Sequence, residues 1–496
     1  MISRIQLIST VLFLLGIVGC AVSPDNQAGL LDIASPENFS ADTEMSPFRN
    51  RGWLLDFNDP TLDQLVVEAL EHNYNLQAAA ARLKAAMAET GIVSSFQFPQ
   101  LNVDASTGRS KQVFELPGGK IDTSHQNRSN LGIGVFWEVD LWGRLKNRTQ
   151  AALADFEAEE EFYRAARLSL AANTLKLWFH AVESELQVEL AQDSLNTFES
   201  NQEIVENGYR RGITSPLDVH LTRANVEAAR SALNRRRRIR SAAARSLEVL
   251  LGRYPSNEIA IADELPALNQ PVPVGLPSKL LSRRPELAAS ERYLAAALER
   301  GKASRKDLLP NISLTGRGGS SSSDLQDLLD AERIAWNIAG NLAQPVFQGG
   351  RLLSQIRFSD AQVDRAFFSY SQSVLLAFQE VETLLTDAIF LRKEEKALRL
   401  AVDESINAES LAWEQYQRGL GNVITVLESQ RRSFNSKSSL IQLTNARLQT
   451  RLDLYLALGG EFFPSGQSGS EGTDEVEGKG KETEALKILY GSGEVL

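Results

Sequence analysis

The sequence predicts an internally duplicated membrane protein of the α+β type, in which pairs of strands are followed by very long helices. Three observations support this class. Two stretches about 200 residues apart match without a gap, a period far longer than that of solenoid repeats. Segments in both copies alternate apolar and polar residues, and two long runs contain neither glycine nor proline. The chain is therefore predicted to be built from two copies of one structural unit.

The duplication defines the expected domains. The segment NGYRRGITSPLDVHL from Asn207 aligns with EQYQRGLGNVITVLE from Glu414, and Tyr209 thereby meets Tyr416. Each copy is expected to contain a helix, a strand pair and a long helical hairpin. The expected boundaries are a signal peptide at 1–19, a tether at 20–60, a first repeat at 61–252, a connector at 253–277, a second repeat at 278–460 and a polar, disordered tail at 461–496.

The strand signal is an alternation with a period of two residues. Apolar residues occupy the odd positions of LGIGVFWEVDL, from Leu131 to Leu141, and polar or small residues occupy most of the even ones. The second copy repeats the pattern around Ile312 and Trp336. We predict four strands of about ten residues, typical of transmembrane β-barrels. Polar loops are expected at Arg109–Asn130 and Arg317–Arg333.

The helical signal is strongest after each strand pair. The runs Arg144–Asn207 and Arg351–Arg418 contain no helix-breaking residue, and each ends in a glycine-containing turn, at Gly212 and at Gly419 with Gly421. Return helices are expected at Pro216–Leu251 and Asn422–Leu458, the first with Ser215 as its N-cap. A further helical spacing extends from Thr61 to Ser94.

The N-terminus has the layout of a secretory signal. A short basic region precedes a mostly apolar run, which ends in Ile17-Val18-Gly19-Cys20. The pattern resembles a bacterial lipobox, which implies cleavage before Cys20 and lipidation of its sulfur. Ala21 follows, where an aspartate would favour retention in the inner membrane. Because Cys20 is the chain's single cysteine, no intrachain disulfide is expected.

Composition argues against two classes of function. A net charge of −11 disfavours a general nucleic-acid binder. The four histidines are scattered and none lies in a metal-ligand motif, and the chain has no phosphate-binding glycine loop. No catalytic residue, cofactor or metal site is therefore predicted.

Four strands cannot close a barrel in lipid, because bacterial barrels need at least eight. Two chains would supply eight strands with a plugged interior, and three would supply twelve with room for a lumen. The sequence therefore predicts that several chains assemble.

Specific motifs suggest the family. WEVDLWGR at Trp137–Arg144, QPVFQGGR at Gln344–Arg351 and the paired YxRG tips resemble the TolC-like outer membrane factors, in particular the lipid-anchored efflux members of nodulation-protein-T type. The resemblance covers roughly Trp53 to Gly460. It implies a homotrimer with a twelve-stranded barrel in the outer membrane and a twelve-helix periplasmic tunnel. It also implies two partners, a periplasmic adaptor and an inner-membrane transporter, expected to be proton-driven.

The resemblance also implies gate residues at the hairpin tips. Tyr416 and Asp218 match a tyrosine–carboxylate link, or latch, that holds the tunnel closed. Ile424 and Glu428 match an apolar and an acidic ring at the constriction. Three-fold symmetry would bring three Glu428 carboxylates together and raise their pKa by mutual repulsion. A second link in the family uses an arginine at a position that is Gly421 here.

Some alternatives remain open at this stage. The arginine run Arg235–Arg238 is either a patch that docks an adaptor or anionic groups, or a solvated outer helix face paired with local acids, and we favour the second. The duct could serve a polypeptide secretion system in place of small-molecule efflux. In a third hypothesis the chain is a periplasmic coiled-coil lipoprotein that transports nothing.

Overall fold

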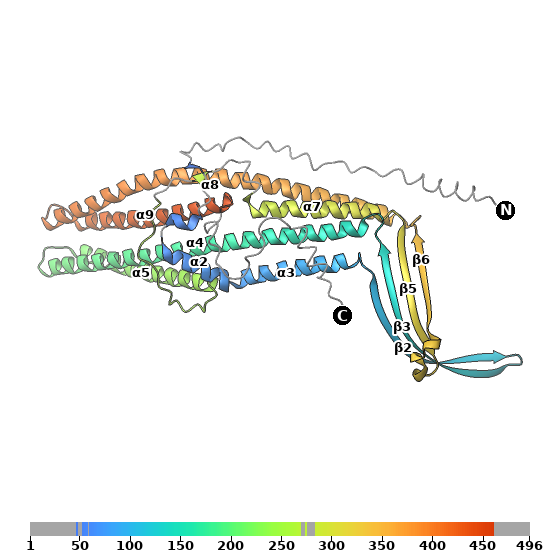
Figure 1. Cartoon of the computed structure of the whole chain (residues 1–496). Coiled ribbons are helices and arrows are strands. Elements are labelled where there is room, and N and C mark those ends of the chain that lie inside the picture. The colour runs from blue at the N-terminus through green and yellow to red at the C-terminus, as the bar shows by residue number, and fades with distance from the viewer. Residues whose placement is uncertain (1–45, 48–51, 58, 269–272, 275–282, 461–496) are drawn as a thin grey trace. The chain divides into compact units, whose positions relative to one another are not determined.

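The structure, a computed structural model, describes residues 46–47, 52–57, 59–268, 273–274 and 283–460. Cys20 and the predicted signal peptide and tail lie outside these residues. The chain order is shown in Figure 1. The elements are β1 (Ser46–Pro47), η3 (Trp53–Phe57), α2 (Pro60–His72), α3 (Tyr74–Ser95), β2 (Gln100–Leu116), β3 (Lys120–Val139), α4 (Arg144–Arg210), α5 (Pro216–Leu250), β4 (Pro273–Val274), α7 (Pro285–Lys306), β5 (Asn311–Ser322), η4 (Leu325–Leu329), η5 (Ala331–Arg333), β6 (Ala335–Ala343), α8 (Arg351–Gln417) and α9 (Val423–Ala457).

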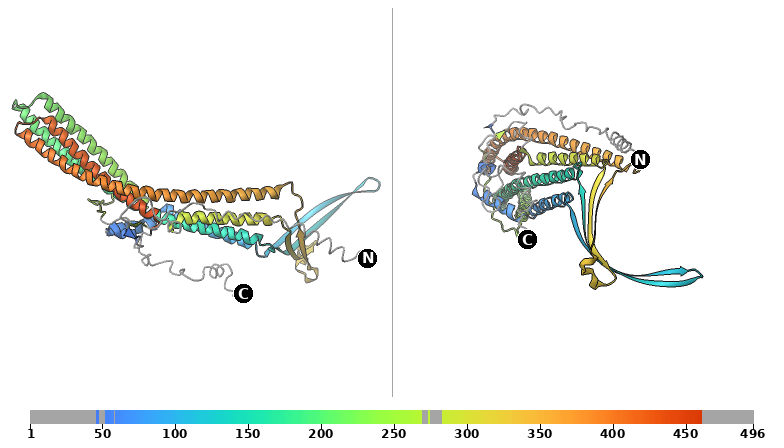
Figure 2. Two further views of the ribbon diagram at one scale, coloured as in Figure 1. Left: turned by 90° about the horizontal axis from the view of Figure 1, so that it is seen from above. Right: turned by 45° about the vertical axis from the view of Figure 1, so that its right-hand side comes forward.

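The duplication is visible in the helix lengths. Helices α3 and α7 have 22 residues each, α4 and α8 have 67 each, and α5 and α9 have 35 each. Helices α3, α4, α7 and α8 pack side by side in that order, and α4 and α8 continue into hairpins with α5 and α9. The two hairpins lie against each other through α4 and α9, and the left view of Figure 2 shows them side by side.

The four long strands form one antiparallel sheet in the order β2-β3-β5-β6. Its two faces differ, as the alternation predicted. On the polar face, Asp104 and Arg317 form an ion pair at 3.2 Å across the glycines of the intervening strand β3. A side chain at Gly132 would contact the Asp104 carboxylate, and this explains why the even positions of β3 include glycine.

The predicted strand length of about ten residues holds for β5 and β6, with 12 and 9 residues, but is wrong for β2 and β3, with 17 and 20. Most of Arg109–Asn130 is strand, because β2 and β3 pair as far as Leu116 and Lys120 around the turn at Gly118 and Gly119. Polar residues occupy both faces there, so no apolar alternation marks the extension. The predicted loop 317–333 is likewise partly strand, because β5 continues through the glycine- and serine-rich stretch to Ser322. In this stretch Gly319 has no room for a side chain, since a Cβ there would lie 2.5 Å from a backbone oxygen of β3.

The helical spacing from Thr61 to Ser94 is interrupted at Asn73. This buried side chain accepts a hydrogen bond from Leu76 N and donates one to Leu250 O at 2.8 Å. It therefore ends α2, caps α3 and ties both to the end of α5. An asparagine in a helical pattern gives no clear boundary signal, and the prediction missed the break.

A large buried apolar cluster lies where α2 and η3 cover α4, α5 and α9. Trp53 stacks on Tyr455 with ring centroids 5.8 Å apart and donates a hydrogen bond to Gly460 O. Its other central members include Phe57, Leu175 and Phe179. Since each fully buried side chain of this size contributes about 1.5–3 kcal/mol, the cluster fixes the N-terminal elements on one face of the helices.

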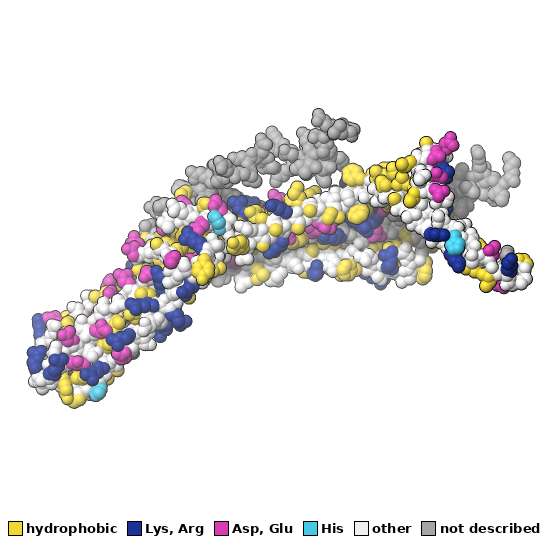
Figure 3. All heavy atoms as spheres, turned by 90° about the horizontal axis from the view of Figure 1, so that it is seen from below, with side chains coloured by type: hydrophobic (Ala, Val, Ile, Leu, Met, Phe, Trp, Pro, Cys, Tyr) yellow, Lys and Arg dark blue, Asp and Glu magenta, His cyan; other side chains and the backbone are white. Residues whose placement is uncertain are grey.

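Among the described residues, no helix combines the length and the apolar character needed to cross a membrane. On the face drawn in Figure 3, charged side chains of both signs are spread along the helices, and hydrophobic side chains gather on part of the sheet.

Candidate gate at the hairpin tips

Both hairpin tips turn through the same backbone motif. At the first tip, Gly212 has φ +75°, and Ile213 N donates to Gly208 O at 2.9 Å. At the second, Gly419 has φ +73°, and Leu420 N donates to Gln415 O at 2.9 Å. These are Schellman turns, in which a left-handed residue closes the last helical carbonyls and glycine is strongly preferred. The two glycines therefore occupy the turns that the sequence predicted.

The return helices begin with different caps. Ser215 and Asp218 form a capping box, each side chain accepting from the other's backbone N–H at 3.2 Å. In the second copy Asn422 accepts from Thr425 N at 2.9 Å. The Asp218 carboxylate is thus held at the start of α5, where its negative charge also suits the helix dipole.

Tyr416 lies near this carboxylate. Its ring stacks on Trp413 with centroids 5.8 Å apart and packs against the apolar cluster at the tips. Burial, and then the negative charge of Asp218, raise the pKa of Tyr416. In the described part of the single chain no hydrogen bond joins the phenol to the carboxylate, whose Oδ2 accepts from Ser215 N.

Ile424 and Glu428 lie one turn apart on the solvent side of α9, opposite the buried Val423 and Val426. Ile424 is 54% exposed. The Glu428 carboxylate accepts from Arg431 at 2.5 Å, and the resulting hydrogen bond lowers the pKa of Glu428. Within one chain this effect is opposite in sign to the mutual repulsion that three-fold symmetry would add. The arginine one turn further along offsets the negative charge within each chain.

Gly421 leaves little room for a side chain. A Cβ there would lie 3.3 Å from both Gln415 Cβ and Tyr416 N. An arginine at this position, as in the second link of the family, would require the turn to shift.

The first hairpin carries a ladder of polar cross-links, which recur every seven residues along α4 and which the sequence analysis did not predict. They join α4 to α5 at distances of 2.7–3.0 Å and comprise Glu185–Arg240, Gln192–Arg237, Glu199–Arg230 and Glu206–Arg223. The arginine run 235–238 contributes Arg237 to this ladder, and Arg236 donates to Ser438 Oγ. The positions 207 residues later, such as Trp413 opposite Gln430, carry no matching acid–base pairs. Arg447, the equivalent of Arg240, pairs with Glu395 of α8 instead, and this is a single cross-link at the end of the hairpin nearer the sheet. The second hairpin therefore lacks the ladder.

A polar seam joins the two hairpins between α4 and α9. Asn201 Nδ2 donates to Gln430 Oε1 at 2.7 Å, and both side chains are buried. Further along, Gln187 contacts Ser438 and Asn445 contacts Glu183. The sequence signal for this seam is a set of polar residues that recur at helical spacing among apolar ones. Such buried amide pairs are costly to leave unpaired, so they fix how the hairpins align.

No group of histidine, cysteine or acidic side chains in the described residues is arranged to hold a metal ion. The geometry is that of a scaffold, with a four-stranded membrane sheet at one end and two helical hairpins at the other. Such a chain builds a wall of a larger channel.

Comparison with known proteins identifies the class. The family model of the outer membrane efflux proteins matches residues 65–253 and 276–460, and the chain belongs to this family. It is 30% identical to the antibiotic efflux pump outer membrane protein ArpC of Pseudomonas putida, over 94% of this chain and 97% of that protein. It is 29% identical to the cation efflux system protein CusC of Escherichia coli strain CFT073, over 90% and 96%. The solved outer-membrane channel OprN has a TM-score of 0.77 and 27% identity, and the match covers 87% of this chain and 99% of that one.

These matches confirm the predicted fold class, a trimeric twelve-stranded β-barrel continued by a twelve-helix α-barrel. They also confirm an outer-membrane efflux duct with a large periplasmic part, working with adaptor and transporter partners. The family is one of channels, which disfavours the hypothesis of a coiled-coil lipoprotein that transports nothing. The roles of individual gate residues, and of Cys20, stay predictions.

Proposed function

We propose that this chain is the passive exit duct for small molecules in a tripartite pump whose energy comes from a proton-driven inner-membrane transporter. No enzymatic step is part of this function. The support is the family membership, together with relatives named for antibiotic and toluene efflux. The trimer would be held in the outer membrane by its barrel and by lipid on Cys20.

We further propose that the periplasmic tips close the duct, with Tyr416 and Asp218 as the latch and Ile424 and Glu428 at the constriction. The observation that carries this proposal is that Tyr416 of the second hairpin packs on the apolar cluster shared by both tips, near the capped Asp218 of the first hairpin. Burial, and then the charge of Asp218, raise the pKa of the phenol. A phenol-to-carboxylate hydrogen bond is charge-assisted, yet it can be broken when a partner binds. The second hairpin, which lacks the polar ladder, is the element expected to move.

The latch is tested by single-channel recording of the purified trimer in planar bilayers. The double variant Asp218→Ala with Tyr416→Phe is expected to raise conductance, because the closed tip loses its cross-link. Tyr209→Phe is the matched control, since Tyr209 is the equivalent tyrosine at the first tip. Unchanged conductance in the double variant, with the trimer intact, would refute the latch.

The cargo class is tested in a Gram-negative host that lacks its own duct but keeps the cognate adaptor and transporter. Expression of the chain should lower cellular accumulation of small fluorescent dyes. The rival is a duct for secreted polypeptides, and neighbouring genes that encode an ATP-driven exporter would favour it. Cross-linking from membranes, followed by identification of the captured adaptor and transporter, separates the two.

A further inference from the structure

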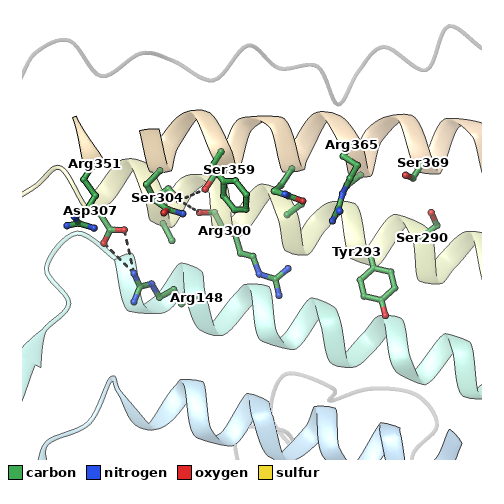
Figure 4. Close-up of a pocket in the computed structure, with 16 residues that line it drawn as sticks. Arg148, Ser290, Tyr293, Arg300, Ser304, Asp307, Arg351, Ser359, Arg365 and Ser369 are labelled. Carbon is green, nitrogen blue, oxygen red and sulfur yellow. Dashed lines mark hydrogen bonds and ion pairs between the residues drawn. The ribbon is translucent and has the colours of Figure 1, made fainter. Parts of the chain in front are cut away.

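A wide cleft of about 940 Å³ lies just beyond the sheet, between α4, α7 and α8. Four arginines from the three helices line it, as Figure 4 shows, and they are Arg148, Arg300, Arg351 and Arg365. A single acidic residue, Asp307, is among the lining side chains. Serine hydroxyls from α7 and α8 complete the polar lining, with Ser304 and Ser359 hydrogen-bonded to each other at 2.6 Å.

The charges of this cleft do not balance within the described chain. Arg148 pairs with Asp307 at 3.4 Å, and Arg300 pairs with Asp155. Arg351 donates instead to the neutral Gln348 at 3.1 Å, and no acidic side chain of the described residues lies within ion-pair distance of Arg365. Two guanidinium groups therefore face the cleft without a counter-charge, and concave sites of one sign focus the field on an incoming ion.

Helical phase places the cleft on the lumen side. The elements α2 and η3 cover one face of α4 around Leu175, and a duct must keep its axis open, so that face is the outer one. Arg148 lies about seven and a half turns before Leu175, and Asp155 about five and a half, at 3.6 residues per turn. Both therefore lie on the opposite face of α4, which in a closed tube faces the lumen.

The sheet independently places the cleft on the lumen side. Glu138 occupies an even position of β3, on the polar face that also carries Asp104 and Arg317. It pairs with Arg144, which also contacts Asp307 at the edge of the cleft. In a barrel the polar face of the sheet lines the interior. A series of ion pairs thus runs from Glu138 on the polar face of the sheet to Arg148 in the cleft.

We propose that these four arginines form an anion-binding collar in the lumen below the barrel, which favours cargo that carries phosphate, sulfonate or carboxylate groups. Guanidinium groups bind such oxyanions through two parallel hydrogen bonds. Three-fold symmetry brings twelve of them to a zone about 20 Å deep, because Arg365 lies 14 residues after Arg351 along α8. This inference rests on the proposed small-molecule duct and narrows its cargo to organic anions. It also distinguishes this chain from a duct suited to cations.

The test is isothermal titration of the intact, detergent-purified trimer with inorganic pyrophosphate at about 0.1 M salt, where exposed charges are screened. Wild type is expected to bind with a Kd below about 1 mM. The double variant Arg351→Gln with Arg365→Gln should bind at least about tenfold more weakly, because it loses the two unbalanced charges. Arg164→Gln is the matched control, since Arg164 lies about four and a half turns after Arg148 and so on the outer face of α4.

A second readout locates the site in the lumen. Under a KCl gradient across a planar bilayer, the double variant should shift the reversal potential toward cation selectivity, and Arg164→Gln should not. The inference is overturned if wild type fails to bind pyrophosphate, as would happen if acids of a neighbouring subunit neutralise the arginines. It is also overturned if the double variant binds like wild type, or if the control loses binding equally. None of these outcomes affects dye export by the pump, which tests the proposed function separately.

Discussion

Glu248 fixes the connector between the two repeats, and replacing it should release that segment. The side chain is 2% exposed at the end of α5. Its carboxylate accepts backbone hydrogen bonds from Asn257 at 2.7 Å, Glu258 at 2.8 Å and Ile259 at 3.2 Å. Burial raises the pKa of Glu248, but the three backbone N–H groups together bring it below its usual range.

The cost of Glu248→Gln follows from those contacts. Charge-assisted hydrogen bonds contribute about 1.5–3 kcal/mol each and neutral ones about 0.5–1.5 kcal/mol, and the amide can satisfy only part of the set. One buried backbone N–H would then face an NH₂ group. We expect the local opening free energy of the connector to fall by about 2–4 kcal/mol.

Hydrogen exchange of the 257–259 amides measures this directly in the folded trimer. A loss of that size corresponds to exchange about 30- to 700-fold faster. Glu258→Gln is the control, because Glu258 is a neighbouring exposed acid. Since the pKa of Glu248 in the folded chain lies below its ordinary value of 4.5, its contribution to stability is present above pH 4.5. That contribution is lost as the pH falls through the folded pKa. Equal protection of these amides in both variants at pH 7 would refute the reasoning.

Three further predictions concern stability, each measured by thermal unfolding of the purified trimer. Gly252→Ala should destabilise the folded trimer by about 1–3 kcal/mol, because Gly252 has φ +77° and a Cβ would lie 2.6 Å from His72 O. Gly91→Ala is the control and should not destabilise the trimer, since there is open space around Gly91. Asn201→Leu should lower stability by about 1–3 kcal/mol, because it leaves the buried Gln430 side chain unpaired. The double variant with Gln430→Leu should recover much of that stability, and additive losses from the two substitutions would contradict the pairing. Tyr455→Phe should cost about 1 kcal/mol through its lost bond to Asp56. Burial raises the pKa of Tyr455, so this contribution should persist below pH 10 and fade only as pH rises through the raised pKa.

The sequence predicted those parts of the fold whose signal is local. The Schellman glycines Gly212 and Gly419 and the cap at Ser215 follow from backbone conformations that few residues adopt. The lipid-facing positions of β3 follow from alternation, because one face must be apolar. The extension of β2 and β3 was missed because a ribbon that is polar on both faces leaves no periodic signal.

Interactions between elements that are far apart in the chain leave no local signal in the sequence. Asn73 looks like any helical asparagine until Leu250 O, from a distant part of the chain, lies beside it. The same holds for Arg148 and Arg365, which come together only when α4, α7 and α8 are side by side. Their role in a collar depends on which face of α4 is covered, and α2 and η3 decide that.

The two repeats use one position for different tasks. Glu248 and Tyr455 are equivalent residues at the ends of α5 and α9, and each holds a segment that packs on the outside of the helices. Glu248 binds the backbone of the connector, and Tyr455 binds Asp56 and stacks on Trp53 of η3. Both hairpins are thus fixed at the end nearer the sheet. Toward the tips, the ladder from Glu185 to Arg223 cross-links only the first hairpin. Motion at the tips is therefore expected to be concentrated in α8 and α9, with its pivot near Tyr455.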